Sequence, residues 1–145
     1  MRFLVYVAAG LVLGALLFVA KVVFAGGLPE GPVAAVWDHE ACAFCRMHVG
    51  EPAFAAQLQT KDGQVLFFDD PGCLFETLDR DQPLVHALYF RHMQADRWLA
   101  RDEVAFAQVA ITPMGYGIGA VERGTAGALS VDEAHAKVRK KREER

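Results

Sequence analysis

The chain has 145 residues, 53% of them hydrophobic, which is enough apolar content for one compact domain or two very small ones. The formal net charge is −3, but residues 30–136 alone carry sixteen acidic and seven basic side chains. An acidic body argues against nucleic acid as a partner and is compatible with binding a cation or a basic protein surface.

The N-terminal run from Phe3 to Ala20 holds eighteen uncharged residues, which would span about 27 Å as a helix, close to the thickness of a bilayer core. Arg2 precedes this run and acidic residues follow Pro29, so the sequence predicts an inner-membrane anchor with the body facing the periplasm or cell exterior. A signal peptidase would also accept the segment that ends at Ala25, and the body would then be secreted. The run is longer than a usual signal core, which favours the uncleaved anchor.

Three segments follow from this pattern. Residues 1–25 are predicted to be the membrane anchor or signal sequence, and residues 26–40, which begin with a Gly- and Pro-rich stretch, a linker. Residues 41–145 are predicted to form the folded domain.

The stretch from Cys42 to His48 is the part of the chain richest in soft donor atoms, with Cys42, Cys45, Met47 and His48 inside seven residues. A C-x-x-C pair is found in disulfides, redox-active dithiols and zinc sites, whereas c-type haem attachment requires His directly after the second cysteine, where this chain has Arg46. Sulfur ligands suit Cu(I), zinc or Fe–S iron, and the added thioether and imidazole favour a soft metal ion.

Residues 54–90 predict a β-β-α-β unit. Phe54–Thr60 and Gln64–Phe68 have the pattern of two strands joined by a turn at residues 61–63. Asp69 and Asp70 before Pro71 are typical of a helix start, and that helix is predicted to end near Arg80. Residues 84–90 predict the third strand.

The second half repeats this order in shorter form. Trp98–Glu103 is short and polar, residues 104–110 and 118–121 predict strands, and the loop between them is Thr112-Pro-Met-Gly-Tyr-Gly117. Residues 132–141 predict a helix, with Ser130 and Glu133 spaced as a capping box. The second unit is therefore β-β-α, with its fourth element missing or very short.

Three ordered motifs resemble those of the NosL family, which are copper-delivery accessory proteins of nitrous oxide reductase: Cys42-Ala-Phe-Cys45-Arg-Met47, Phe68-Asp-Asp-Pro-Gly-Cys73 and Thr112-Pro-Met114-Gly, with Trp98 between the last two. The resemblance implies an α+β fold of two small ββαβ-type units, related to that of organomercury lyase, with the second unit truncated here. It also implies a metallochaperone rather than an enzyme, with one Cu(I) bound through sulfur and export to the periplasm. The implied partners are a copper-dependent client enzyme or an ABC-type assembly complex, with the CuZ site of nitrous oxide reductase as the implied destination.

The resemblance maps the family's thiolate ligand to Cys45 and its two thioether ligands to Met47 and Met114. One thiolate and two thioethers suit Cu(I), which is soft and accepts few ligands. Four further residues are weaker ligand candidates, namely Cys42, His48, Cys73 and His92.

Two other functions fit the same residues. The first is an exported thiol–disulfide oxidoreductase that uses Cys42 and Cys45, although these cysteines precede a strand and lack the strand-to-helix setting of thioredoxin-type pairs. The second is a structural zinc module with four ligands, Cys42, Cys45, His48 and Cys73. A Cys42–Cys45 disulfide would abolish the copper site, whereas a Cys42–Cys73 disulfide would leave Cys45 free.

Overall fold

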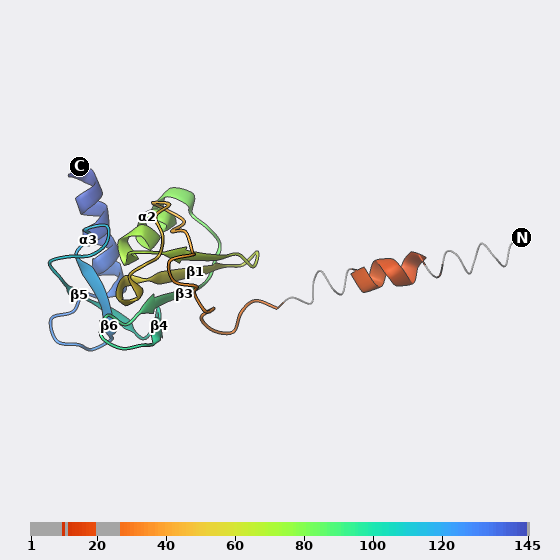
Figure 1. Cartoon of the computed structure of the whole chain (residues 1–145), viewed down its shortest axis with the longest axis horizontal. Helices are drawn as coiled ribbons and strands as arrows, with labels where there is room; N and C mark the ends of the chain where they lie inside the picture. The colour runs from red at the N-terminus through yellow and green to blue at the C-terminus, as the bar shows by residue number, and fades with distance from the viewer. Residues whose placement is uncertain (1–9, 11, 20–26, 145) are drawn as a thin grey trace, which may run out of the picture.

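The computed structural model describes residues 10, 12–19 and 27–144. Between residues 52 and 143 the chain is a small mixed α/β domain with two antiparallel sheets (Figure 1). Its elements are the 3-10 helix η1 (Pro52–Phe54), strands β1 (Ala56–Thr60) and β2 (Val65–Phe68), helix α2 (Pro71–Asp81), strands β3 (Val85–Arg91), β4 (Trp98–Ala100), β5 (Val104–Gln108) and β6 (Ile118–Glu122), and helix α3 (Val131–Glu143).

The first half has the element order that its sequence pattern predicts. Strands β1 and β2 form a hairpin, β3 pairs with the other edge of β1, and the short strand β4 extends the sheet to the order β2-β1-β3-β4. Gly63 has a φ of +88° in the hairpin turn, a conformation that costs glycine little because it has no Cβ. Strand β1 begins two residues later than predicted, because Pro52 starts a 3-10 turn in which the Ala55 N–H donates to the Pro52 carbonyl oxygen.

Both helices begin at the predicted caps. Asp70 accepts a hydrogen bond from the Gly72 N–H at 2.8 Å, and Pro71 occupies the first turn of α2. Ser130 and Glu133 form the reciprocal capping box at the start of α3. Local sequence signals therefore determine where each helix starts.

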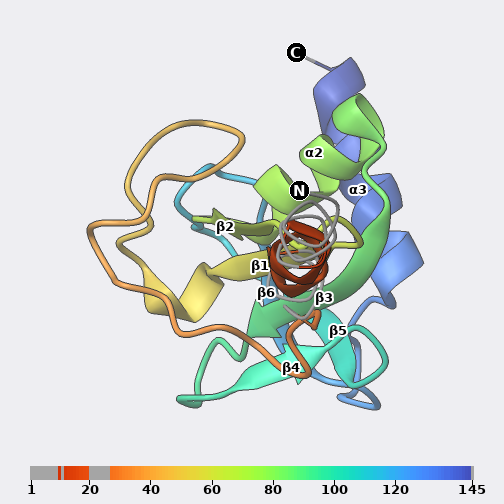
Figure 2. The ribbon, with the colours of Figure 1, turned by 90° about the vertical axis from the view of Figure 1, so that its right-hand side faces the viewer.

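The second half consists of the β5-β6 hairpin and α3. Helix α3 packs against α2 and β5, so that α2 and α3 lie next to each other beside the strands (Figures 1 and 2). The two halves share one core, in which the rings of Phe75 on α2, Phe90 on β3 and Phe106 on β5 contact one another at centroid distances of 5.0–5.8 Å. These three rings join both sheets to the helix that carries Cys73.

Strand β1 is buried on both faces, because residues 31–33 lie against the face that carries Gln57 and Gln59. The Gln57 side chain accepts from the Val33 N–H at 2.9 Å and donates to the Val33 carbonyl at 2.8 Å. The Gln59 side chain donates to the Gly31 carbonyl at 2.8 Å. These bonds tie part of the predicted linker to the sheet.

The predicted membrane segment lies largely outside the described residues. Residues 12–19 are helical. Within the parts of the chain that the structure describes, no helix has the length and apolar character needed to cross a membrane.

Candidate metal site

The segment from Ala41 to His48, here called the cysteine loop, is closed by its own backbone. Ala41 and His48 form an antiparallel bridge, and inside it the Cys42 N–H donates to the Met47 carbonyl at 2.8 Å. The Arg46 N–H returns to the Cys42 carbonyl at 3.0 Å, with Arg46 in the left-handed region at a φ of +67°. This tight turn places the two cysteine side chains of the C-x-x-C pair near each other.

Cys73 reaches the same point from a different element. It lies in the first turn of α2, where its N–H donates to the Asp70 carbonyl at 2.9 Å. The sulfur atoms of Cys42, Cys45 and Cys73 all lie within 4.8 Å of one another. Cys42 and Cys73 are fully buried, Cys45 is half-buried, and all three are free thiols.

Hydrogen bonds give the three thiols different acidities. The Cys73 thiol donates to the sulfur of Cys42, and the N–H groups of Cys45, Asp69 and Phe44 donate to it as well, so the pKa of Cys42 falls from 9.0 to about 5 against the opposing effect of burial. The same Cys73–Cys42 bond, together with burial, raises the pKa of Cys73, and burial raises the pKa of Cys45. Cys42 is therefore the most acidic of the three thiols, and a bound metal cation would displace the protons that remain on them.

The loop from Thr112 to Gly117, here called the methionine loop, lies against the start of α2. The Met114 N–H donates to Oδ2 of Asp70 at 3.1 Å, while Oδ1 of the same carboxylate caps the helix. Gly115 and Gly117 both have φ values near +70°, a conformation that glycine adopts at little cost because it has no Cβ. Met114 is half-buried against the core.

Comparison with known proteins supports a fold assignment. No protein-family model matches the chain, and no curated protein sequence matches it. The structure is similar to the crystal structure of the copper chaperone NosL from Shewanella denitrificans, with a TM-score of 0.51 over 77% of this chain and 89% of that one, at 20% sequence identity. This chain has a NosL-like fold. The resemblance that the three sequence motifs predict is thereby confirmed at the level of the fold.

The structure brings the three cysteines together, including Cys42 and Cys73, which the sequence offered as weaker candidates. Met47 lies in the cysteine loop with 52% of its surface exposed, and its N–H donates to the sulfur of Cys45. The assignment of Cys45, Met47 and Met114 as the ligand set stays a prediction.

The two histidine candidates lie apart from the thiols. His48 is exposed at the end of the cysteine loop. His92 uses both ring nitrogens elsewhere, because Nδ1 accepts from the Gln94 N–H at 3.0 Å and Nε2 donates to Glu122 at 2.7 Å. Neither histidine belongs to the group of donors that converges with the cysteines.

Asp69 and Asp70 have different tasks, although the sequence predicts both as helix caps. Only Asp70 caps α2. Asp69 accepts a hydrogen bond from the N–H of Gly50, two residues after the cysteine loop, at 3.1 Å. Burial raises the pKa of both carboxyl groups, and the bonds from Thr112, Gly72 and Met114 oppose that rise for Asp70.

Two residues with a structural part in the site were missed by sequence analysis. The ring of Tyr116 lies directly over Gly72, so a Cβ at Gly72 would be only 2.1 Å from the ring. A glycine in the first turn of a helix, next to a cysteine, was the available signal for such a close approach.

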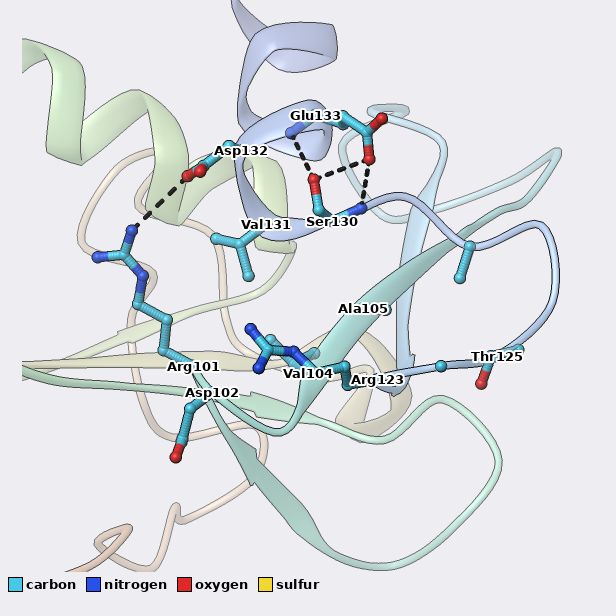
Figure 3. Close-up of a pocket in the computed structure, with 12 residues that line it drawn as sticks. Arg101, Asp102, Val104, Ala105, Arg123, Thr125, Ser130, Val131, Asp132 and Glu133 are labelled. Atoms are coloured by element: carbon cyan, nitrogen blue, oxygen red, sulfur yellow. Dashed lines mark hydrogen bonds and ion pairs between the residues drawn. The ribbon is translucent and has the colours of Figure 1, made fainter.

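A separate cavity of about 540 Å³ lies beside the start of α3 (Figure 3). Arg101 and Arg123 line it together with Asp102 and Asp132, and Arg101 is 3.7 Å from Asp132. Its walls contain no cysteine, methionine or histidine, so it offers a soft metal ion no ligand.

Proposed function

We propose that this protein is an exported, membrane-anchored metallochaperone that binds Cu(I) and passes it to a copper enzyme. The observation that supports this function is the convergence of three free thiols from two separate elements, the cysteine loop and α2, within 4.8 Å. Thiolate sulfur is a ligand that Cu(I) prefers, and the fold is similar to that of a protein described as a copper chaperone. No catalytic turnover is part of the proposal.

The proposed ligand set is the thiolate of Cys45 with the thioethers of Met47 and Met114. Cys45 is half-buried and Met47 is half-exposed, so both are accessible to the donor groups of a partner protein. Cys42 and Cys73 are fully buried and would supply further sulfur. A site that combines accessible ligands with buried thiols suits transfer by stepwise ligand exchange.

The proposed partners follow from the NosL resemblance. They are a copper-dependent client enzyme or an ABC-type assembly complex, with the CuZ site of nitrous oxide reductase as the proposed destination. The proposed location is the inner membrane, with the body in the periplasm, or a secreted body if the chain is cut after Ala25.

The copper proposal is tested by titrating the full chain in detergent, without oxygen, with Cu(I) in competition with a chromophoric chelator. We expect one Cu(I) per chain. Because loss of groups that merely orient a ligand costs about 10–100-fold in metal affinity, Cys45→Ser is expected to weaken binding by more than about 100-fold. Met93→Leu is the matched control, since Met93 packs near Gly119. Absence of Cu(I) binding, or equal affinity of Cys45→Ser and the wild type, contradicts the proposal.

One observation favours an oxidoreductase as the second candidate. The pKa of Cys42 lies near 5, as in reactive dithiol pairs, and Cys45 is close enough to resolve a mixed disulfide. Cys42 is fully buried, however, so a protein disulfide has no access to its sulfur in this conformation. Catalytic reduction of insulin that is lost in both single cysteine variants would favour this candidate over copper delivery.

The zinc alternative requires a fourth ligand beside the three thiols. The sequence offers His48 for that position, and His48 is exposed and outside the group of converging donors. Metal analysis separates the two cases: tightly held zinc whose removal unfolds the domain would identify a structural zinc site.

A further inference from the structure

One buried carboxylate connects the helix that carries Cys73 to the loop that carries Met114. Asp70 is fully buried, and Oδ1 accepts from the Gly72 N–H at 2.8 Å at the start of the helix that bears Cys73. Oδ2 accepts from the Met114 N–H at 3.1 Å, and the Thr112 hydroxyl bonds to the same carboxylate. Each oxygen thus holds a different part of the site.

Capping a helix requires only one of these oxygens. Serine and asparagine cap helices about as well as aspartate does, and they do so without burying a charge. Burying a carboxylate is costly unless hydrogen bonds satisfy it. The second oxygen of Asp70 and its bonds to the methionine loop account for a carboxylate at this position.

The methionine loop has further contacts with α2 and α3. The Tyr116 ring packs on Gly72, and the Tyr116 hydroxyl is 3.4 Å from Glu76. Lys141 on α3 donates to the carbonyl of Gly115. These contacts orient the loop against α2, and the Asp70 bond acts directly on the backbone of Met114.

We propose that Asp70 is a positioning residue that fixes the Met114 thioether relative to the thiols of the metal site. This inference rests on the proposed copper function and on Met114 as one of its ligands. Asp70 does not touch the metal in this arrangement; it sets the distance between the helix that carries Cys73 and the loop that carries Met114. The Asp70 side chain would thereby control whether the Met114 sulfur is available as a ligand.

A double-mutant cycle tests the proposal with two variants, Asp70→Asn and Met114→Leu. Asparagine keeps one side-chain oxygen and is a good helix cap, but its amide nitrogen cannot accept from the Met114 N–H. Met114→Leu removes the sulfur and keeps an apolar side chain of similar size. The readouts are the Cu(I) dissociation constant, from chelator competition, and the number of sulfur ligands, from X-ray absorption.

If Asp70 acts through Met114, Asp70→Asn raises the Cu(I) dissociation constant about 10-fold in the wild-type background, as expected for loss of a group that orients a ligand. In the Met114→Leu background the same change has an effect of less than about twofold, because effects of coupled residues are not additive. The sulfur count falls by one in each single variant and no further in the double variant. Asp69→Asn is the matched control, with the same charge change one residue away and no coupling to Met114→Leu expected.

An equal loss of affinity in both backgrounds would overturn the proposal and leave Asp70 as a helix cap alone. Wild-type affinity and sulfur count in Met114→Leu would overturn it too, while Cu(I) binding that still depends on Cys45 would keep the copper function intact. If Asp70→Asn does not fold, Thr112→Val replaces it in the same cycle, because it removes a bond to the carboxylate and leaves the helix cap in place.

Discussion

The cysteine loop and the methionine loop, which carry the proposed copper ligands, are held in place in different ways. The cysteine loop is closed by the Ala41–His48 bridge and by backbone bonds from Cys42 to Met47 and from Arg46 to Cys42, all within eight residues. The methionine loop has one internal backbone bond, from Gly115 to Thr112. The Gly117 N–H also donates to the Thr112 hydroxyl at 3.3 Å, and the Val109 N–H donates to the Gly117 carbonyl at 3.1 Å. At Met114 and Gly115, however, the bonds come from distant side chains at the start of α2 and on α3.

The shape of the cysteine loop therefore depends mainly on its own residues, whereas the position of Met114 in the methionine loop depends on other elements. The cysteine loop keeps its shape mainly through bonds between its own residues, with one further backbone bond from the Ala43 N–H to the Phe67 carbonyl on β2 at 2.9 Å. The position of Met114 depends on Asp70, forty-four residues earlier in the chain. Changes in α2 are therefore expected to move the methionine loop first, and changes inside the cysteine loop are expected to alter the thiols alone.

The largest expected effect is on the pH dependence of stability, through Cys42→Ser in the metal-free, reduced protein. The folded pKa of Cys42 is about 5 against an ordinary value of 9.0, so between these values the folded state binds fewer protons than the unfolded state. Its contribution to the free energy of unfolding is complete above about pH 9 and disappears as the pH falls through about 5. Urea titrations of wild type and variant from pH 5 to 9 measure the difference.

We expect the wild type to gain stability relative to Cys42→Ser as the pH rises through this range. Above pH 9 the sign reverses for the other two thiols, because the raised pKa values of Cys45 and Cys73 keep the folded state protonated while the unfolded chain ionises. Asp70→Asn serves as the control and is expected to keep the gain, since the bonds to Cys42 come from Cys73, the cysteine loop and Asp69. A pH-independent difference between wild type and Cys42→Ser would show that Cys42 is not the thiolate.

The next effect in size is that of Gly72→Ala on the methionine loop. The added Cβ would be 2.1 Å from the ring of Tyr116, so the ring and its loop must move away from α2. Overpacking of this kind costs about 1–3 kcal/mol of stability. We also expect the loss of one sulfur ligand in the X-ray absorption spectrum of the Cu(I)-loaded protein.

Gly31→Ala is the matched control for that change, because a Cβ at Gly31 has no neighbour within 4 Å. It is expected to leave both the stability and the sulfur count as in the wild type. If Gly72→Ala keeps all of its sulfur ligands, the methionine loop is less dependent on α2 than its contacts indicate.

Features that depend on neighbouring residues are also the ones that the sequence alone predicts. The caps at Asp70 and Ser130 and the glycine turns are local signals, and the structure confirms them. The start of β1 was misplaced because Pro52 favours a 3-10 turn over an extended strand. Local patterns thus predict the elements, with errors of one or two residues at their ends.

The site depended on information that no local pattern contains. The C-x-x-C pair indicated a metal, but the approach of Cys73 to Cys42 follows from packing α2 under the cysteine loop. The packing of Tyr116 on Gly72 likewise joins segments more than forty residues apart. The motif resemblance gave the order of the three cysteines along the chain, whereas their convergence is visible only in the structure.

The smallest effect on copper is expected from Gln57→Ala, which tests whether affinity follows global stability or the position of the loops. Gln57 is fully buried and pairs with both backbone groups of Val33, while Gln59 donates to its oxygen at 2.9 Å. Leaving these buried groups without partners costs about 1–3 kcal/mol in the free energy of unfolding. Neither ligand loop bonds to Gln57, so the Cu(I) dissociation constant should change by less than about twofold. If Gln57→Ala and Gly72→Ala destabilise the fold equally but only Gly72→Ala loses a sulfur ligand, copper binding depends on the restraint that α2 places on the methionine loop. If Gln57→Ala loses as much Cu(I) affinity as Gly72→Ala, any weakening of the fold is enough to open the site.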